Sequence, residues 1–363
     1  MQLSGNSSHI ETWISKESVE DEGRSYNVMV TLGKPIDILS LKAAVVQDFA
    51  GQFEYHRETR MALFKSGELQ EVDACPVCGA SAVNSEFRAS IYGGRYHQCS
   101  GCSHCFIIAR LPEAALKAFY ATDRRYASTY VDKQSLETRV QQVAVPKAKW
   151  VIEQFKAVYG REPKSILDIG AGGGHFVHAL EQLGFEAKGI EVSGVNIEFC
   201  RTNFGFELEA VDFSEQWRAF PNFDIITFWG LIEHVPDPLS ILTAAYNALR
   251  ERQALVVACV PHWDSFSTAV QTIPQFGVVR HLDPLGHLHV FTDGSLATAF
   301  EISGFAPVAA WYFGMDIYEL FMQLTMLAND KLTGVSGKLI PTLQNAIDRG
   351  RLSDSMVLAG TPL

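Results

Sequence analysis

The chain has 363 residues, of which 47% are hydrophobic and 20% charged, a composition typical of a globular protein with a large core and unlike that of a disordered chain. A formal net charge of −11 disfavours an extended surface for nucleic acid or anionic membranes, because both would repel an acidic protein. The polar N-terminus lacks a signal segment, and apolar runs such as residues 254–260 are too short to cross a bilayer, so we expect a cytoplasmic protein.

Residues 1–74 form an N-terminal extension that contains no motif with an assigned role. Residues 26–32 alternate weakly like a strand, Gly33 and Pro35 mark a turn, and residues 39–64 have apolar positions near helical spacing. The sequence therefore predicts an additional α+β segment. We expect it to act as a lid, as a layer on the region that follows, or as the contact of a homodimer.

The second region, residues 75–112, contains cysteines at the spacing of a zinc site. They form two C-x2-C pairs separated by twenty residues: Cys75 with Cys78, and Cys99 with Cys102. Two such turns present four thiolates to one tetrahedral Zn²⁺, whereas two disulfides would need an oxidising compartment that nothing else in the sequence indicates. The prediction is a zinc ribbon. Cys105 is an alternative ligand, although its apolar surroundings favour a buried thiol.

Residues 113–160 are expected to be a mostly helical linker or lid, and Tyr126 and Tyr130 within it are candidate substrate contacts. From residue 161 to 363, strands alternate with helices, which predicts a largely parallel sheet covered on both faces. The predicted strands are residues 165–169, 186–191, 207–210, 223–229, 254–260, 305–312 and 355–360.

The first of these strands leads into three alternating glycines, Gly170, Gly172 and Gly174. Glycine suits this position because a side chain would block a tight strand-to-helix turn and the close approach of backbone to ligand. The second predicted strand ends at Glu191, where a carboxylate can accept both hydroxyls of a ribose. These features predict a nucleoside-binding α/β domain. The spacing after Asp168 is D-x-G-x-G-x-G and differs from the G-x-G-x-x-G of dinucleotide sites.

This loop resembles motif I of the class I S-adenosylmethionine-dependent methyltransferases. Residues 211–213 and 223–230 match later parts of that pattern, and residues 231–238 resemble the EHVPDP signature of the branch that includes ubiquinone-biosynthesis O-methyltransferases. The resemblance covers about residues 140–363. It implies a Rossmann-like sheet of seven strands, the last antiparallel, and S-adenosylmethionine as the cofactor. Residues 96–120 resemble the ribbon that precedes such domains in bacterial enzymes associated with sugar, surface-polysaccharide or natural-product tailoring.

The resemblance also implies a donor site. Asp168 and Gly170 would face the methionine end, Glu191 the ribose and Asp212 the adenine. Gly172, Gly174 and Trp229, at the end of the fourth strand, complete the expected donor contacts.

Methyl transfer is an in-line displacement that depends mainly on alignment, but a hydroxyl acceptor also benefits from a base. His234 is the candidate base and Glu233 would orient it; a structural role for His234 in the turn that follows is an equal alternative. Some ubiquinone-type relatives hold a divalent metal with two glutamates and a histidine of this region. Gly230 occupies the first of those positions here, so no catalytic metal is expected.

Residues 261–292 form an insertion after the fifth strand and are the best candidate for a substrate cover, because ligands in α/β sheets lie beyond the carboxyl ends of the strands. Its candidate substrate residues are His262, His287 and His289. For His287 and His289, packing or substrate contact is expected rather than general-base catalysis.

The expected function is S-adenosylmethionine-dependent methyl transfer to a small polar metabolite, such as an activated sugar, a surface-glycan precursor or a natural-product intermediate. One alternative is an RNA methyltransferase that binds RNA through the ribbon, but residues 75–110 contain only Arg88, Arg95 and Arg110 as basic side chains. The other alternative is a non-catalytic zinc-ribbon scaffold, which the intact glycine loop and Glu191 argue against.

Overall fold

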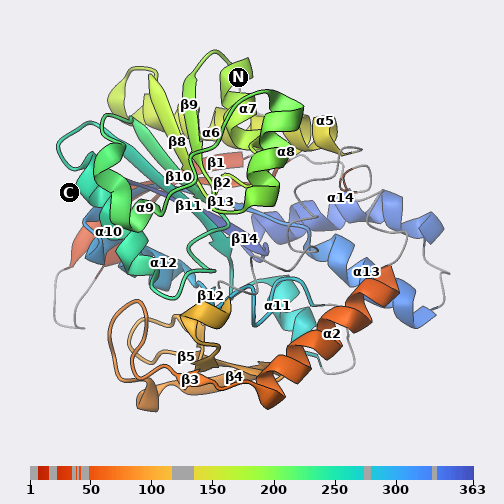
Figure 1. Ribbon diagram of the computed structural model, residues 1–363. Helices are drawn as coiled ribbons and strands as arrows, with labels where there is room; N and C mark the ends of the chain where they lie inside the picture. Colours follow the sequence, from red (N-terminus) through yellow and green to blue (C-terminus); the bar gives the residue numbers. More distant parts are fainter. Residues whose placement is uncertain are drawn as a thin grey trace.

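The structure is a computed structural model that describes residues 7–15, 23–34, 38, 41, 49–116, 135–273, 279–328 and 333–363. Figure 1 shows a large sheet flanked by helices and a smaller lobe that contains β3, β4, β5 and α2. In the described part of the chain, no helix is both long and apolar enough to span a bilayer.

The main sheet contains eight strands in the order β1-β2-β13-β14-β11-β10-β8-β9. Their bounds, in that order, are Ser7–Ser15, Arg24–Leu32, Phe305–Phe313, Ser355–Pro362, Leu255–Pro261, Ile225–Trp229, Ser165–Ile169 and Glu186–Ile190. Strands β8, β9, β10 and β11 are mutually parallel, and β14 is antiparallel to both of its neighbours. The α/β methyltransferase fold with an antiparallel last strand is therefore confirmed.

The number of strands differs from the predicted seven in two places. Residues 207–210 are not a strand: Glu209 makes a single bridge to Ile190, because only Leu208 in this segment is buried and able to anchor it. At the opposite edge, β1 and β2 of the N-terminal extension add an antiparallel hairpin to the sheet.

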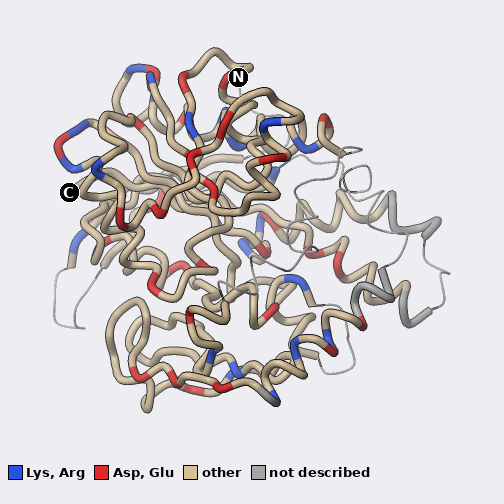
Figure 2. The backbone as a smooth tube through the Cα atoms, viewed as in Figure 1, with Lys and Arg blue, Asp and Glu red and all other residues tan. Residues whose placement is uncertain are grey.

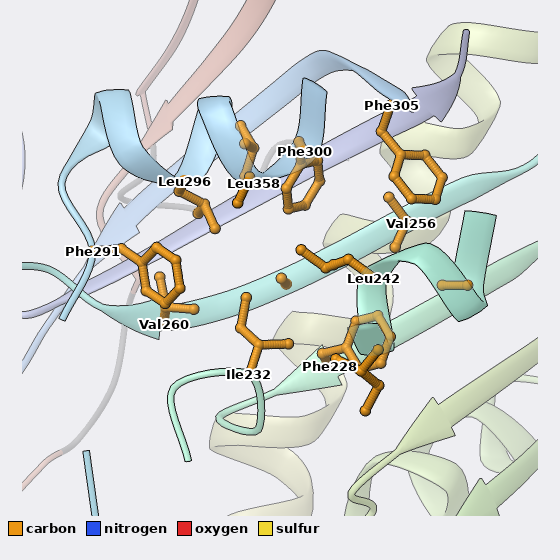
Figure 3. Close-up of a cluster of buried hydrophobic side chains, with 14 of the residues drawn as sticks. Phe228, Ile232, Leu242, Val256, Val260, Phe291, Leu296, Phe300, Phe305 and Leu358 are labelled. Atoms are coloured by element: carbon orange, nitrogen blue, oxygen red, sulfur yellow. The ribbon is translucent and has the colours of Figure 1, made fainter. Parts of the chain in front are cut away.

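Helices cover both faces of the sheet. On one face, α6 (Val145–Tyr159) and α7 (His175–Gln182) bury Trp150, Phe155 and Leu180 against strand residues such as Val257. On the other face, α10 (Pro238–Leu249) and α12 (Asp293–Ile302) pack on β10, β11 and β14. Figure 3 shows Leu242, Leu296 and Phe300 pointing from these two helices toward the strands. Each strand thus buries alternate side chains on both faces, as expected for a covered parallel sheet.

The structure describes further helices besides these four. They are α2 (Phe49–Ser66), α5 (Leu136–Arg139), α8 (Gly194–Phe204), α9 (Phe213–Gln216), α11 (Phe266–Gln271), α13 (Asp316–Ala328) and α14 (Thr333–Arg349), with 3-10 turns at 82–84 and 217–219 and a π-helical turn at 140–144.

The smaller lobe contains the four cysteines and a four-stranded sheet in the order β12-β6-β5-β4. The bounds of β4, β5, β6 and β12 are Glu86–Ile91, Gly94–Gln98, Cys105–Ile107 and His289–Val290; β3 (Gln70–Glu71) pairs with β7 (Ala109–Arg110). Strand β12 belongs to the insertion after β11, so this insertion is part of the ribbon sheet. The ribbon is thereby hydrogen-bonded to the loop expected to cover the substrate.

The N-terminal hairpin is joined to the main sheet by two tryptophans. Trp150 Nε1 donates to Thr31 Oγ1 at 3.1 Å, Trp311 Nε1 donates to the Gly33 carbonyl at 2.8 Å, and the two indoles stack at 5.4 Å. Strand β2 is parallel to β13, so the residues after Leu32 emerge at the same sheet edge as the glycine loop. A homodimer formed through the extension stays a prediction.

The Trp150–Thr31 hydrogen bond generates a stability prediction. Thr31→Val keeps the side-chain shape but leaves the buried indole N–H without its acceptor, so the free energy of unfolding should fall by about 1–3 kcal/mol. Urea denaturation measures this change. Thr12→Val, on the exposed strand β1, is the matched control and should shift stability by less than about 0.5 kcal/mol. Equal stability of the two variants would contradict the assigned role of the bond.

Candidate functional site

The glycine loop between β8 and α7 has a backbone that side chains would disrupt. Gly170, Gly172 and Gly174 have φ of 74°, 53° and 79°, a left-handed conformation that non-glycine residues rarely adopt. A Cβ on Gly174 would also lie 2.5 Å from the Cys200 sulfur. The conformation of the loop at the start of α7 therefore depends on its glycines.

Glu191 closes this loop from the end of β9. Its Oε2 accepts from Gly172 N at 2.8 Å, and its Oε1 accepts from Val192 N and Ser193 N, each at 2.8 Å. Burial raises the pKa of Glu191, although the three backbone donors favour the carboxylate. Both carboxylate oxygens of Glu191 already accept hydrogen bonds from backbone amides. A ribose that donates both of its hydroxyls to Glu191 would therefore share these two oxygens with the amides.

Asp168 and Asp212, the other two acids expected in the donor site, have different surroundings. Asp168 is buried on β8 and its Oδ1 accepts from Thr227 Oγ1 at 2.7 Å; burial raises its pKa to about 7. Asp212 is exposed and caps α9, where it accepts from Ser214 N at 3.0 Å. A contact between Asp212 and adenine stays a prediction.

Trp229, at the carboxyl end of β10, contacts a lysine that the sequence did not single out. Lys147 Nζ lies 4.3 Å from the centre of the indole ring, on the side of the sheet where α6 packs. The indole Nε1 is buried and has no hydrogen-bond partner among the described residues. Lys147 is half-buried on α6, and burial lowers its pKa; Asp168, Glu233 and Cys259 act on it electrostatically.

A second lysine, Lys34, lies at the same edge. It follows β2, and its Nζ lies 4.7 Å from the centre of the Phe313 ring at the end of β13. Burial and the neighbouring Lys147 lower the pKa of Lys34 to about 7. No local sequence pattern pointed to Lys34, because its position at the sheet edge near the glycine loop depends on the pairing of β2 with β13.

Glu233, His234 and His287 come together, the first two from the loop after β10 and the third from the insertion. His234 Nε2 lies 3.6 Å from Glu233 Oε1, and the two imidazole rings are 4.9 Å apart. Ligand atoms of the three side chains lie within 4.8 Å of one another, a donor set that suits a divalent ion. The expectation that Glu233 orients His234 or touches the donor stays a prediction; the approach of His287 was not predicted.

The protonation of this group follows from its burial. Burial lowers the pKa of His234 to about 3 and raises the pKa of Glu233 to about 8. His234 Nδ1 lies 2.6 Å from the Gly286 carbonyl, and His287 Nδ1 lies 2.7 Å from the His281 carbonyl. The Glu233 Oε2 atom is buried without a partner among the described residues. Near neutral pH, both rings are therefore neutral and Glu233 is mainly protonated.

His262 and His289, two other candidate substrate residues, lie outside the group of Glu233, His234 and His287. His262 is buried, with Nδ1 3.1 Å from the Ser353 carbonyl and Nε2 3.6 Å from Asp293 Oδ1. His289 is fully buried, with Nε2 3.0 Å from the Val235 carbonyl and Nδ1 3.1 Å from His104 Nε2 of the ribbon. Both histidines thus connect loops. Tyr126 and Tyr130 lie outside the described residues.

The four predicted cysteine ligands form one cluster. Cys75 Sγ lies 3.6 Å from Cys102 Sγ, Cys78 Sγ lies 3.5 Å from Cys99 Sγ, and all four sulfurs lie within 4.8 Å of one another. A tetrahedral Zn²⁺ with bonds of about 2.3 Å would hold its sulfurs about 3.8 Å apart, so the cluster fits such an ion. Cys105 is buried outside this group, and burial raises the pKa of its thiol.

Comparison with known proteins agrees with this geometry. Residues 142–310 match a family described as "Methyltransferase domain". The ubiquinone biosynthesis O-methyltransferase of Aliivibrio fischeri strain MJ11 is 27% identical over 130 residues, which is 34% of this chain and 54% of the relative. The enzyme with the same description from Hydrogenovibrio crunogenus is 32% identical over 106 residues, 27% of this chain and 42% of the relative. The chain thus spans about half the length of the curated relatives that it matches.

The solved structures that resemble this chain include a SAM-dependent methyltransferase from Archaeoglobus fulgidus. It is 20% identical in sequence, the TM-score is 0.41, and the alignment covers 63% of this chain and 99% of that one. A plantazolicin methyltransferase has 14% identity, a TM-score of 0.46, and coverage of 68% and 93%. The assignment of the domain rests on the family match and the observed strand order, and not on these two structural similarities. Together, the family match, the strand order and the glycine loop show that residues 142–310 are a methyltransferase domain of the S-adenosylmethionine-dependent class.

Proposed function

We propose that the protein transfers the methyl group of S-adenosylmethionine to a small polar acceptor. The observation that carries this proposal is the glycine loop with Glu191 bonded across it, because this pairs a left-handed glycine turn before a helix with a carboxylate at the end of the neighbouring strand. When bound, S-adenosylmethionine supplies an electrophilic methyl group, and the chain's own task is to hold the acceptor in line with it.

The residues around the glycine loop are chemically suited to such a cofactor. We propose that buried Asp168, on the strand that leads into the loop, faces the ammonium group of the methionine part and that Glu191 binds the ribose. The indole N–H of Trp229 remains as a buried donor without a partner in the described chain. Such a group favours a polar ligand at this edge, since an unsatisfied buried donor is costly.

The charge distribution supports a small acceptor over RNA. Arg88 bonds to Glu86 and Gln98, and Arg110 is turned inward, donating to the Pro236 carbonyl at 3.0 Å. On the neighbouring helix α2, Arg57 pairs with Glu54 and Arg60 with Asp283. Figure 2 shows acidic and basic residues interspersed along the backbone of this lobe. A phosphate-binding stripe would need basic side chains that are not already paired.

Within the catalytic pair, we propose that Glu233 accepts the proton of a hydroxyl acceptor and that His234 positions it. This reverses the roles expected from the sequence. An imidazole with a pKa of about 3 is a weak proton acceptor, whereas a carboxylate with a pKa of about 8 is a much stronger base than an ordinary one. His234 is instead bonded to the backbone of the insertion at Gly286.

For the ribbon, we propose one structural zinc ion bound by Cys75, Cys78, Cys99 and Cys102. The sulfur separations and the Gly101 amide, which donates to Cys99 Sγ at 3.3 Å, are typical of a zinc-binding turn. The ion would stabilise the lobe that pairs with the insertion through β6 and β12.

Donor binding is tested with Glu191→Gln. The variant loses the negative charge that accepts from the ribose and from Gly172, so the affinity for S-adenosylhomocysteine should fall by ~10-fold or more, equivalent to a charged hydrogen bond of ~1.5–3 kcal/mol. Glu186→Gln, on the exposed start of the same strand, is the control and should bind normally. Titration calorimetry measures the affinity of both variants for S-adenosylhomocysteine. Wild-type protein that does not bind S-adenosylhomocysteine, or that prefers a nicotinamide dinucleotide, would overturn the proposed function.

Proton transfer is tested by the pH dependence of methyl transfer from labelled donor to a panel of small hydroxylated acceptors. The pKa of Glu233 is raised, so its basic form grows with pH and the wild-type rate should rise through about pH 8. Glu233→Gln should lower kcat by ~10²–10⁴ with little change in donor affinity, and His234→Gln by less.

Two outcomes of that experiment count against the assignment. Normal kcat in Glu233→Gln removes this residue as the base. A larger loss in His234→Gln, with an acid limb in the ordinary imidazole range, restores the roles expected from the sequence. Assays with chelator and with added Mg²⁺, Mn²⁺ or Zn²⁺ show whether Glu233, His234 and His287 act through an ion.

Zinc is tested by elemental analysis of freshly purified protein, which should contain about one zinc per chain. Cys75→Ser should lose the metal and loosen the ribbon, because metal binding and local folding are coupled. Cys105→Ser is the matched control, since this thiol lies outside the cluster, and it should keep its zinc. Metal-free wild-type protein would refute the site, and loss of zinc in Cys105→Ser alone would reassign the ligands.

A further inference from the structure

Two lysines at the carboxyl edge of the main sheet have no role in the function proposed above. Lys147 projects from α6 to the Trp229 ring at the end of β10, and Lys34 reaches the Phe313 ring at the end of β13. Lys147 belongs to α6 of the methyltransferase domain, whereas Lys34 follows β2 of the N-terminal hairpin. They are nonetheless close enough to repel each other.

Neither lysine has an acidic partner among the described residues. In the described part of the chain, neither Nζ forms an ion pair with a carboxylate. Asp168 and Glu233 act on Lys147 only from a distance, and burial raises the pKa values of both acids, so their negative charge near neutral pH is reduced. Cys259 acts on both lysines, but its pKa, raised to about 11 by burial, keeps the thiol uncharged.

This arrangement costs stability unless something else occupies it. Two half-buried ammonium groups that repel each other oppose folding, because a desolvated charge without a partner is unfavourable. The indole N–H of Trp229 adds a buried donor without a partner among the described residues. Two lysines whose charged forms a bound anion would favour, together with one neutral donor and no acceptor among the described residues, are the complement of an anion.

The position of the lysines indicates which bound molecule would supply the anion. Asp168 and Glu191, on β8 and β9, belong to the donor half of the sheet edge. Lys34 lies at the other half, beyond β11 and β14, next to the end of β13. Ligands of α/β sheets bind beyond the carboxyl ends of the strands, so a molecule beside the donor would extend toward Lys34.

We propose that Lys34 and Lys147 bind an anionic group, a carboxylate or a phosphate, of the methyl acceptor. This inference rests on the proposed function, because it deepens the acceptor side of the same site. It also gives the N-terminal hairpin a role: β2 pairs parallel to β13 and thereby delivers a cation to the acceptor. A lysine suits this task because its ammonium is a compact point charge that needs no fixed planar partner.

The test uses the full chain saturated with S-adenosylhomocysteine, and inorganic phosphate as the probe. Phosphate should bind to the wild type, and Lys34→Met and Lys147→Met should each weaken it by roughly tenfold or more, because each removes a charge-assisted contact at similar side-chain length. Lys34→Arg keeps the charge and should retain most of the binding. Lys149→Met, on the exposed face of the same helix as Lys147, is the matched control and should bind as the wild type does.

Thermal unfolding separates a binding role from a structural one. Without phosphate, Lys34→Met and Lys147→Met should unfold at the same temperature as the wild type or higher, because each removes one of two repelling charges. Phosphate should raise the unfolding temperature of the wild type and have a smaller effect on either variant. Lower stability of both variants without phosphate would indicate structural lysines and overturn the proposal.

The binding data have two further outcomes that overturn it. Phosphate binding that is absent in the wild type, or unchanged in both Met variants, excludes an anion site at these lysines. Phosphate that binds only to protein free of S-adenosylhomocysteine shows that the cofactor's own carboxylate fills the site, which overturns the acceptor assignment. Failure of S-adenosylhomocysteine to bind would contradict the proposed function itself, and phosphate titration of the free protein would then still test the lysines.

Discussion

The parallel arrangement of β2, β13, β11, β10 and β8 is the constraint on which the rest of the structure depends. Parallel strands end at one edge of a sheet, so every loop that leaves a carboxyl end is brought to the same place. The glycine loop, Trp229, the pair of Glu233 and His234, and Lys34 all follow such ends. Residues separated by up to two hundred positions in the chain therefore lie at one sheet edge.

The same edge concentrates groups that are unfavourable for folding. Burial raises the pKa values of Asp168 and Glu233 and lowers those of Lys34, Lys147 and His234. Each shift records a charged form that the protein destabilises, and such groups cluster where a ligand or a reaction compensates for the cost. The hydrophobic layers on the two sheet faces provide the stability that tolerates these groups, with Trp150 and Trp311 on one side and Phe228 and Phe300 on the other.

The ribbon is connected to the loop after β10 through the insertion. Strand β12 pairs with β6, and His289 of β12 contacts His104 of the ribbon as well as the Val235 carbonyl beside Glu233 and His234. The lobe that holds the cysteine cluster is therefore joined to the segment that carries His287. This connection links the cysteine cluster to the loop that carries Glu233 and His234.

The sequence by itself determined the local parts of this protein. Three alternating glycines specify a left-handed turn because other residues avoid that conformation, and two C-x2-C pairs specify a thiolate cluster because the spacing within each pair is fixed by a tight turn. The sequence also predicted the buried strands and the position of Glu191 at the end of the second one, since each of these features is determined by a few neighbouring residues. The segment 207–210 was misread as a strand because its pattern is too short to show that only Leu208 is buried.

Only the tertiary structure decided which distant residues meet. The pairing of β2 with β13, the inclusion of β12 in the ribbon sheet, and the approach of His287 to Glu233 involve contacts whose partners are far apart in the chain. Nothing in the local pattern around Lys34 distinguishes it from a surface lysine. The protonation states of Glu233 and His234 likewise depend on burial, which is a property of the packed molecule, and this is why their roles could not be assigned from sequence.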